Sequence, residues 1–168
     1  MKKYLKKQQG LTLIELVIAM TITLILLSGL SSVLSVSLTT WRLEKSRMAM
    51  VQTARMAVDR VMREVCYAQQ LTVSNPRSLT ITKIDGEINT FELGGGLHGN
   101  TLYMIIDKTA SGGGIATSPL TENNVTELHF TPFSQYGTQA IIMTLIVKDK
   151  NTGVEQELHT AGYPWNQL

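Results

Sequence analysis

Residues 10–41, GLTLIELVIAMTITLILLSGLSSVLSVSLTTW, decide the fold of this chain. The stretch contains one charged residue, Glu15, and residues 16–41 carry no charge at all. A run of that length exceeds the roughly 20 residues that a helix needs to span a bilayer. Gly29 is the only glycine after Gly10, and proline is absent. We therefore predict that residues 11–41 form an unbroken apolar helix, which is the transmembrane half of a longer helix.

A short basic segment precedes this helix. Residues 1–10, MKKYLKKQQG, carry four lysines and end in glycine. A conventional secretory signal loses its apolar stretch on cleavage, and a cut near residues 35–37 would follow that pattern, but the apolar run is too long for such a signal. A cut after Gly10 would instead spare the apolar helix and remove only the basic leader, residues 1–10. Its loss changes the formal net charge from +2 to −2.

Glu15 is the residue of this helix that calls for an explanation. A charged side chain costs about 2.5–3.5 kcal/mol at the centre of a bilayer, so a carboxylate there needs a partner. Cleavage after Gly10 would place a new amino group on Leu11, four residues before Glu15. The alternative is a chance charge near the end of an ordinary membrane anchor.

Residues 42–70 continue as an amphipathic helix half. They contain no glycine or proline, and valines and alanines recur at spacings of three and four: Val51, Ala54, Val58, Val61 and Val65, widened by Met62. Arg55, Asp59 and Arg63 fall on another face, where they could pair weakly. Asn75-Pro76 would then end the helix.

We predict that residues 71–168 form a β-rich head. Alternating apolar segments, interrupted by turn residues, predict strands at 78–84, 87–93, 101–107, 125–133, 139–149 and 154–160. Asp85-Gly86 marks a two-residue hairpin and residues 151–153 a second turn. Strands that follow a helix predict an α+β fold, with one antiparallel sheet packed on the valine stripe of the amphipathic half.

Several functions are disfavoured by composition and spacing. The aromatic share of 6% argues against a stacking surface for single-stranded nucleic acid. The single Cys66 forms no internal disulfide or zinc site, and the glycine runs 94–96 and 112–114 lack a phosphate-loop pattern. His98, His129 and His159 do not have the spacing of metal ligands. Four residues loosely resemble a calcium-binding loop, but a hairpin turn explains them better: Asp149, Asn151, Gly153 and Glu155. We predict no catalytic, cofactor-binding or metal residue, and no enzyme activity.

The segment Gly10-Leu11-Thr12-Leu13-Ile14-Glu15-Leu16 resembles the processing motif of type IV pilins and type II secretion pseudopilins. Leu11 replaces the usual Phe. The resemblance implies that a prepilin peptidase cuts between Gly10 and Leu11 on the cytoplasmic side and methylates the Leu11 amine. It also implies that Glu15 neutralises the amine of a neighbouring subunit, and that the helix anchors the protein in the cytoplasmic membrane with its head outward before assembly.

Within that family the layout is similar to minor, J-type or W-type subunits, because of its Arg-rich helix continuation and the segment NVTELHF at residues 124–130. The expected function is initiation or capping of a type IV pilus, a type II secretion pseudopilus or a DNA-uptake filament. The expected partners are the peptidase, other major and minor pilins and the inner-membrane assembly platform. Two alternatives are a pilus-tip module that binds DNA or a surface ligand, and a plain membrane-anchored extracytoplasmic domain. The net charge of −4 over residues 65–168 disfavours DNA.

Overall fold

The computed structural model describes residues 12–94, 99–135 and 138–165. It divides the chain into two compact units, residues 1–42 and 43–168, and each is considered by itself. The predicted cleavage site, Gly10 and Leu11, lies outside the described residues.

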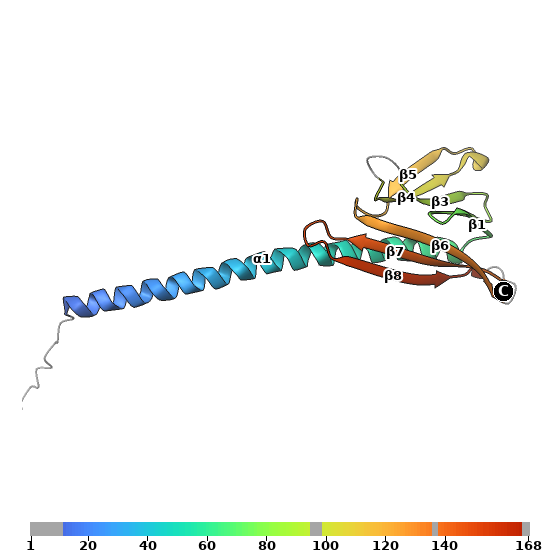
Figure 1. Cartoon of the computed structure of the whole chain (residues 1–168). Coiled ribbons are helices and arrows are strands. Elements are labelled where there is room, and N and C mark those ends of the chain that lie inside the picture. Colours follow the sequence, from blue (N-terminus) through green and yellow to red (C-terminus); the bar gives the residue numbers. More distant parts are fainter. Residues whose placement is uncertain (1–11, 95–98, 136–137, 166–168) are drawn as a thin grey trace, which may run out of the picture. The chain divides into compact units, whose positions relative to one another are not determined.

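One helix, α1, runs from Leu13 to Cys66 and confirms the predicted long helix (Figure 1). In the first unit every described side chain is exposed. The apolar part of α1 is long and apolar enough to cross a membrane, and none of it is buried, so it is not the core helix of a globular domain. In the second unit the predicted valine stripe is buried or half-buried, and Met50 and Ala57 extend it.

The helix ends earlier than the sequence suggested. Its last turn tightens, with Ala68 N–H donating to the carbonyl of Val65 at 3.1 Å, and the chain turns into a strand that was not predicted, β1 (Gln70–Asn75). Asn75-Pro76 therefore does not stop a helix. It forms the turn into β2, where the amide of Arg77 donates to Oδ1 of Asn75 at 2.8 Å.

The first sheet is five-stranded and antiparallel, in the order β1-β2-β3-β4-β5. The further strands are β2 (Ser78–Thr82), β3 (Ile88–Leu93), β4 (Leu102–Asp107) and β5 (Ile115–Pro119). Strand β5 was missed because its five residues are all exposed and show no apolar alternation. It is reached through a short 3-10 helix, η2 (Thr109–Ser111), and the glycines that follow.

The β2–β3 turn is one residue longer than predicted. Lys83 N–H donates to Glu87 O at 2.9 Å, and Gly86 N–H donates to Lys83 O at 3.1 Å, which leaves three residues in the loop. Gly86 has φ +82°, a left-handed conformation that glycine adopts without a steric cost.

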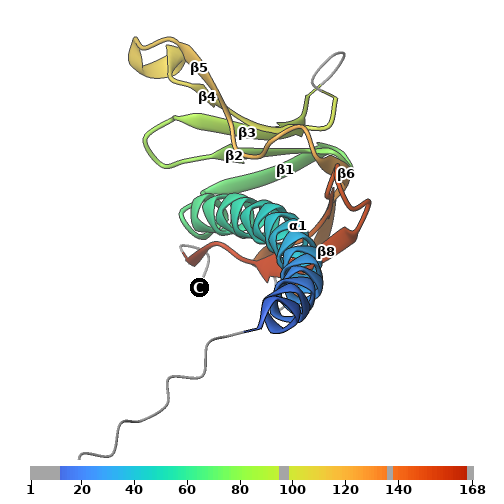
Figure 2. The ribbon, with the colours of Figure 1, turned by 90° about the vertical axis from the view of Figure 1, so that its left-hand side faces the viewer.

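The second sheet is three-stranded and antiparallel, in the order β6-β7-β8. Its strands are β6 (Val125–Gln135), β7 (Thr138–Lys148) and β8 (Glu155–Gly162). The prediction of a single sheet was thus wrong, although the α+β class is confirmed. Figure 2 shows the two sheets on different sides of the second half of α1.

The core of the second unit lies between this half-helix and both sheets. Its fully buried members include Val61 and Val65 of α1, Leu79 and Phe91 of the first sheet, and Met143 of the second. The helix stripe and both sheets contribute to one buried cluster. The sheets also meet directly, where Phe130 N–H donates to the carbonyl of Pro76 at 2.7 Å.

Candidate functional site

The start of α1 is built by Thr12 and Glu15. The amide of Glu15 faces the Thr12 hydroxyl at 3.4 Å, and the amide and the hydroxyl of Thr12 both donate to Oε2 of Glu15, at 3.0 and 2.9 Å. This reciprocal arrangement is a capping box, in which a Thr and a Glu three residues later satisfy otherwise unpaired amides of the first helical turn. Glu15 is therefore held at the helix N-terminus by its own chain.

The capping role of Thr12 was not identified from the sequence, although the Thr-x-x-Glu spacing is its known signal. The function assigned to Glu15 came from its charge within the apolar run and from the resemblance of residues 10–16 to the pilin processing motif. The structure adds that the carboxylate has a fixed position at the positive end of the helix dipole, where a negative group is favoured. Gly10 and Leu11, the other predicted site residues, are not among the described residues, so their position relative to Glu15 stays a prediction.

The hydroxyl side chains of the apolar half do not disturb its helix. Six of them bond to backbone carbonyls three or four residues earlier, at 2.8–3.0 Å: Thr21, Thr23, Ser28, Ser31, Thr39 and Thr40. A hydroxyl satisfied in this way is tolerated in an apolar environment. The surface of residues 16–40 is consequently suited to contact with lipid or with other apolar helices.

A chain of ion pairs fastens the second half of α1 to the first sheet. The buried Glu64 lies 2.9 Å from Arg60, 2.9 Å from Lys83 and 3.0 Å from the side-chain amide of Asn89. Lys83 also contacts Glu87 at 2.7 Å. The weak pairs predicted among Arg55, Asp59 and Arg63 are absent from the ion pairs of the described residues. The acid of this helix that forms ion pairs there is Glu64.

Lys108 extends these ion pairs to the loop after β4, with its ammonium 2.9 Å from Glu87. The hydrogen bonds from Lys108 and Lys83 lower the pKa of Glu87 to about 2. Partial burial alone would lower the pKa of Lys83, but its bonds to Glu87 and Glu64 outweigh that effect and raise it. The pair of Lys83 and Glu87 thus stays charged at neutral pH.

The described residues hold no set of side chains that could ligate a resident metal ion. No group of three or more His, Cys, Asp or Glu converges among them. His129 and His159 each pair with a Glu on their own strand, at 2.8 and 2.9 Å, and Gly112–Gly114 form the turn between η2 and β5. His98 lies outside the described residues.

One of the comparisons with known proteins gives a match, and it covers the N-terminal segment. Residues 5–31 match a family model described as a prokaryotic N-terminal methylation motif. The match supports a pilin- or pseudopilin-type subunit, a structural rather than a catalytic class, and it is consistent with membrane anchoring through the apolar part of α1. No curated protein and no solved structure matches the chain.

Proposed function

We propose that this chain is a minor pilin or pseudopilin, which initiates or caps the assembly of a type IV pilus, a type II secretion pseudopilus or a DNA-uptake filament. The observation that carries the proposal is the methylation motif at residues 5–31, placed at the start of an exposed apolar helix. An apolar helix surface of this kind needs a bilayer before assembly and other helices after it.

Processing is the first step of this function. A prepilin peptidase cuts between Gly10 and Leu11 and methylates the new amine, which keeps its positive charge. The four leader lysines keep the N-terminus on the cytoplasmic side under the positive-inside rule, so the head lies outside.

Docking is the second step. The methylated amine of Leu11 in one subunit pairs with Glu15 of its neighbour as the apolar helices stack. Thr12 contributes by holding the Glu15 carboxylate at the helix start. In a low-dielectric helix bundle a subunit out of register would leave both charges unpaired, so the pair selects the register more than it adds net stability.

Two features favour a minor subunit over a major one. The apolar half of α1 has no proline, whereas many major pilins have one there, and the single Cys66 excludes the C-terminal disulfide loop that many of them carry. The resemblance of the Arg-rich helix continuation and of residues 124–130 to J-type and W-type subunits points the same way.

Mass spectrometry of the native N-terminus tests the processing step. The expected mature chain starts at N-methyl-leucine, residue 11. A chain that starts at Met1, or near residue 36, would refute the proposal. A bulky residue in place of Gly10 should block cleavage, because a peptidase site shaped around glycine has no room for a side chain.

Co-purification with partner pilins tests the docking step. Glu15→Gln should leave membrane insertion and cleavage intact and should reduce recovery of the cleaved chain with its partners. Ser31→Ala is a matched control, since the Ser31 hydroxyl bonds only to the backbone of its own helix. Equal recovery of wild type and Glu15→Gln would show that the carboxylate has no part in assembly.

A further inference from the structure

The outer face of the second sheet carries one tripeptide twice, Glu-Leu-His. It occurs as residues 127–129 of β6 and again as residues 157–159 of β8. The strand pairing sets the two tripeptides level across β7: both glutamates are level with Ile146 and both histidines with Thr144. The leucine of each tripeptide packs against the core on the other face. The two glutamates and two histidines therefore share the face that is turned away from α1.

These four polar side chains form two columns with a ridge of β7 between them. Each glutamate contacts the histidine of its own strand, at 2.8 and 2.9 Å, and the four side chains are 44–61% exposed. On the ridge, Ile146 is half-buried and Ile142 is 38% exposed. Neighbouring strands lie about 4.8 Å apart, so the columns are about 10 Å apart. Because an α-helix is about 10 Å wide, one helix fits lengthwise over β7 between the columns.

The second half of α1 has a free face that fits such a position. Six residues line a groove of about 310 Å³ on the side of the helix opposite the buried stripe: Met48, Val51, Gln52, Arg55, Met56 and Asp59. Met48 and Met56 are 70% and 57% exposed. Arg55 and Asp59 take no part in the ion pairs of the described residues. Residues 52, 55, 56 and 59 have the spacing of a hole that accepts one knob from a packed neighbour.

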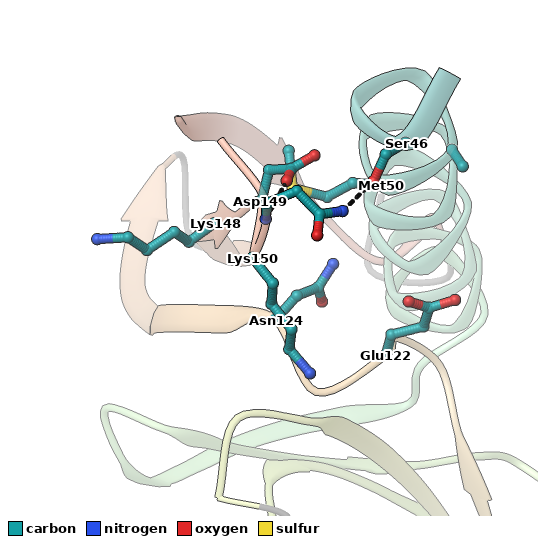
Figure 3. A pocket seen from close by; sticks show the side chains of 9 residues that line it. Ser46, Met50, Glu122, Asn124, Lys148, Asp149 and Lys150 are labelled. Atoms are coloured by element: carbon teal, nitrogen blue, oxygen red, sulfur yellow. Dashed lines mark hydrogen bonds between the residues drawn. The ribbon is translucent and has the colours of Figure 1, made fainter. Parts of the chain in front are cut away.

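Strands β6 and β8 run in the same direction as α1. The turn before β8 meets α1 at Ser46, whose hydroxyl accepts from the side-chain amide of Asn151 at 3.2 Å (Figure 3). Gly162, at the end of β8, lies against Met62 and Val65. Strand β7 is antiparallel to both β6 and β8. Subunits of one filament leave the membrane with the same polarity, so the α1 of a neighbour also runs parallel to these two strands.

In that parallel orientation the charges of the two surfaces match. Along each strand the histidine follows the glutamate by two residues, about 6.8 Å, and along α1 Asp59 follows Arg55 by four residues, about 6 Å. With Ile146 as the knob in the hole, Arg55 lies level with the two glutamates and Asp59 level with the two histidines. An antiparallel helix would carry Asp59 away from the histidines, toward Glu155.

We propose that the outer face of the second sheet binds the free face of α1 of a second copy of this chain, with Ile146 packed between Gln52 and Met56. The inference rests on the proposed function for the parallel arrangement, and it adds that two copies are adjacent in the assembly. Because the two surfaces are different, the contact is heterologous, and it can repeat along a filament instead of closing into a dimer. It joins the heads and is separate from the contact made by Glu15.

Cysteine cross-linking in the membranes of producing cells tests this contact with full-length chains. Cys66→Ala provides a cysteine-free background, in which one copy carries Gln52→Cys and the other carries Ile146→Cys. A short bismaleimide should join the two variants when they are produced together, and it should join neither variant to itself. Thr117→Cys is the matched control: residue 117 is exposed on β5 of the first sheet, so it should not be joined to Gln52→Cys.

Charge reversal tests the pairing of the two surfaces. Arg55→Glu in the Gln52→Cys copy should lower the cross-linked yield at least about fivefold. Reversal of both glutamates in the other copy, by Glu127→Lys and Glu157→Lys, should restore the yield. Arg77→Glu is the matched control, because Arg77 is an exposed arginine in the turn between β1 and β2, and it should leave the yield unchanged.

Three results would overturn the proposal. They are the absence of a cross-link between the two cysteine variants, a cross-link of either variant with itself, and a yield that Arg55→Glu does not lower or that the two lysines do not restore. Recovery with partner pilins separates this contact from the proposed function. If wild type is neither cleaved nor recovered, the proposed function fails. If wild type and Cys66→Ala are both cleaved and recovered but the cross-link is absent, only the contact between copies fails.

Discussion

Glu64 is the side chain on which the attachment of α1 to the first sheet most depends. It is 6% exposed and contacts Arg60, Lys83 and the side-chain amide of Asn89. Asn89 is itself fully buried, and its carbonyl oxygen Oδ1 has no partner. Glu64→Ala would therefore remove one contact of the Asn89 amide, which also bonds to Glu87, and would leave Lys83 with one carboxylate in place of two.

The cost can be worked out from these contacts. A buried donor that loses its partner costs about 1–3 kcal/mol, and removal of one member of a buried ion pair costs about 3–5 kcal/mol in total. Lys83 keeps Glu87, so we expect a value near the lower end, about 3 kcal/mol. That is a large part of the 5–15 kcal/mol typical of a folded domain and corresponds to a melting temperature about 10 °C lower.

Thermal unfolding of the full-length chain, followed by circular dichroism of its strands, measures this effect. Arg60→Ala is the matched control: its side chain is 42% exposed, and the loss should stay within about 1 kcal/mol. If Glu64→Ala were no more destabilising than Arg60→Ala, the buried contacts with Lys83 and Asn89 would not hold the helix to the sheet, and the reasoning would be refuted.

Three further predictions concern the pH response, the packing of the helix and its start. The folded-state pKa of Glu87, about 2, lies below its ordinary value of 4.5, so its contribution is complete above pH 4.5 and is lost as the pH falls toward 2. Because the carboxylate lies near solvent, we expect about 1–2 kcal/mol, seen as a difference between wild type and Glu87→Gln in denaturant unfolding at pH 7 that vanishes near pH 2. In Gly162→Ala the new methyl group would lie 2.8 Å from Sδ of Met62, which should lower stability by about 1 kcal/mol, and Met62→Ala in the same chain should remove that clash. Thr12→Ala should weaken the helix start by about 1 kcal/mol, measured as about fivefold faster hydrogen exchange at the Glu15 amide; unchanged exchange would argue against the capping box.

Most strands of the β-rich head could be predicted from local sequence patterns, and the strands that were missed share a cause. The alternating segments of β2, β3, β4, β6, β7 and β8 were recognised because each buries one face, and alternation records that burial. Strands β1 and β5 were missed because few of their residues are buried: Leu71 alone in β1, and none in β5. Both are held largely by backbone pairing with a neighbouring strand. Backbone pairing leaves little mark on the sequence.

The sequence by itself determined the apolar helix, the methylation motif and the charge of Glu15, because each depends on residues close together in the chain. The tertiary structure alone decided that two sheets share the valine stripe. It also decided that Glu64 meets Lys83 and Asn89. These contacts join residues 19 to 25 positions apart, and such pairings are set by the packing of whole elements against each other, which no local pattern encodes.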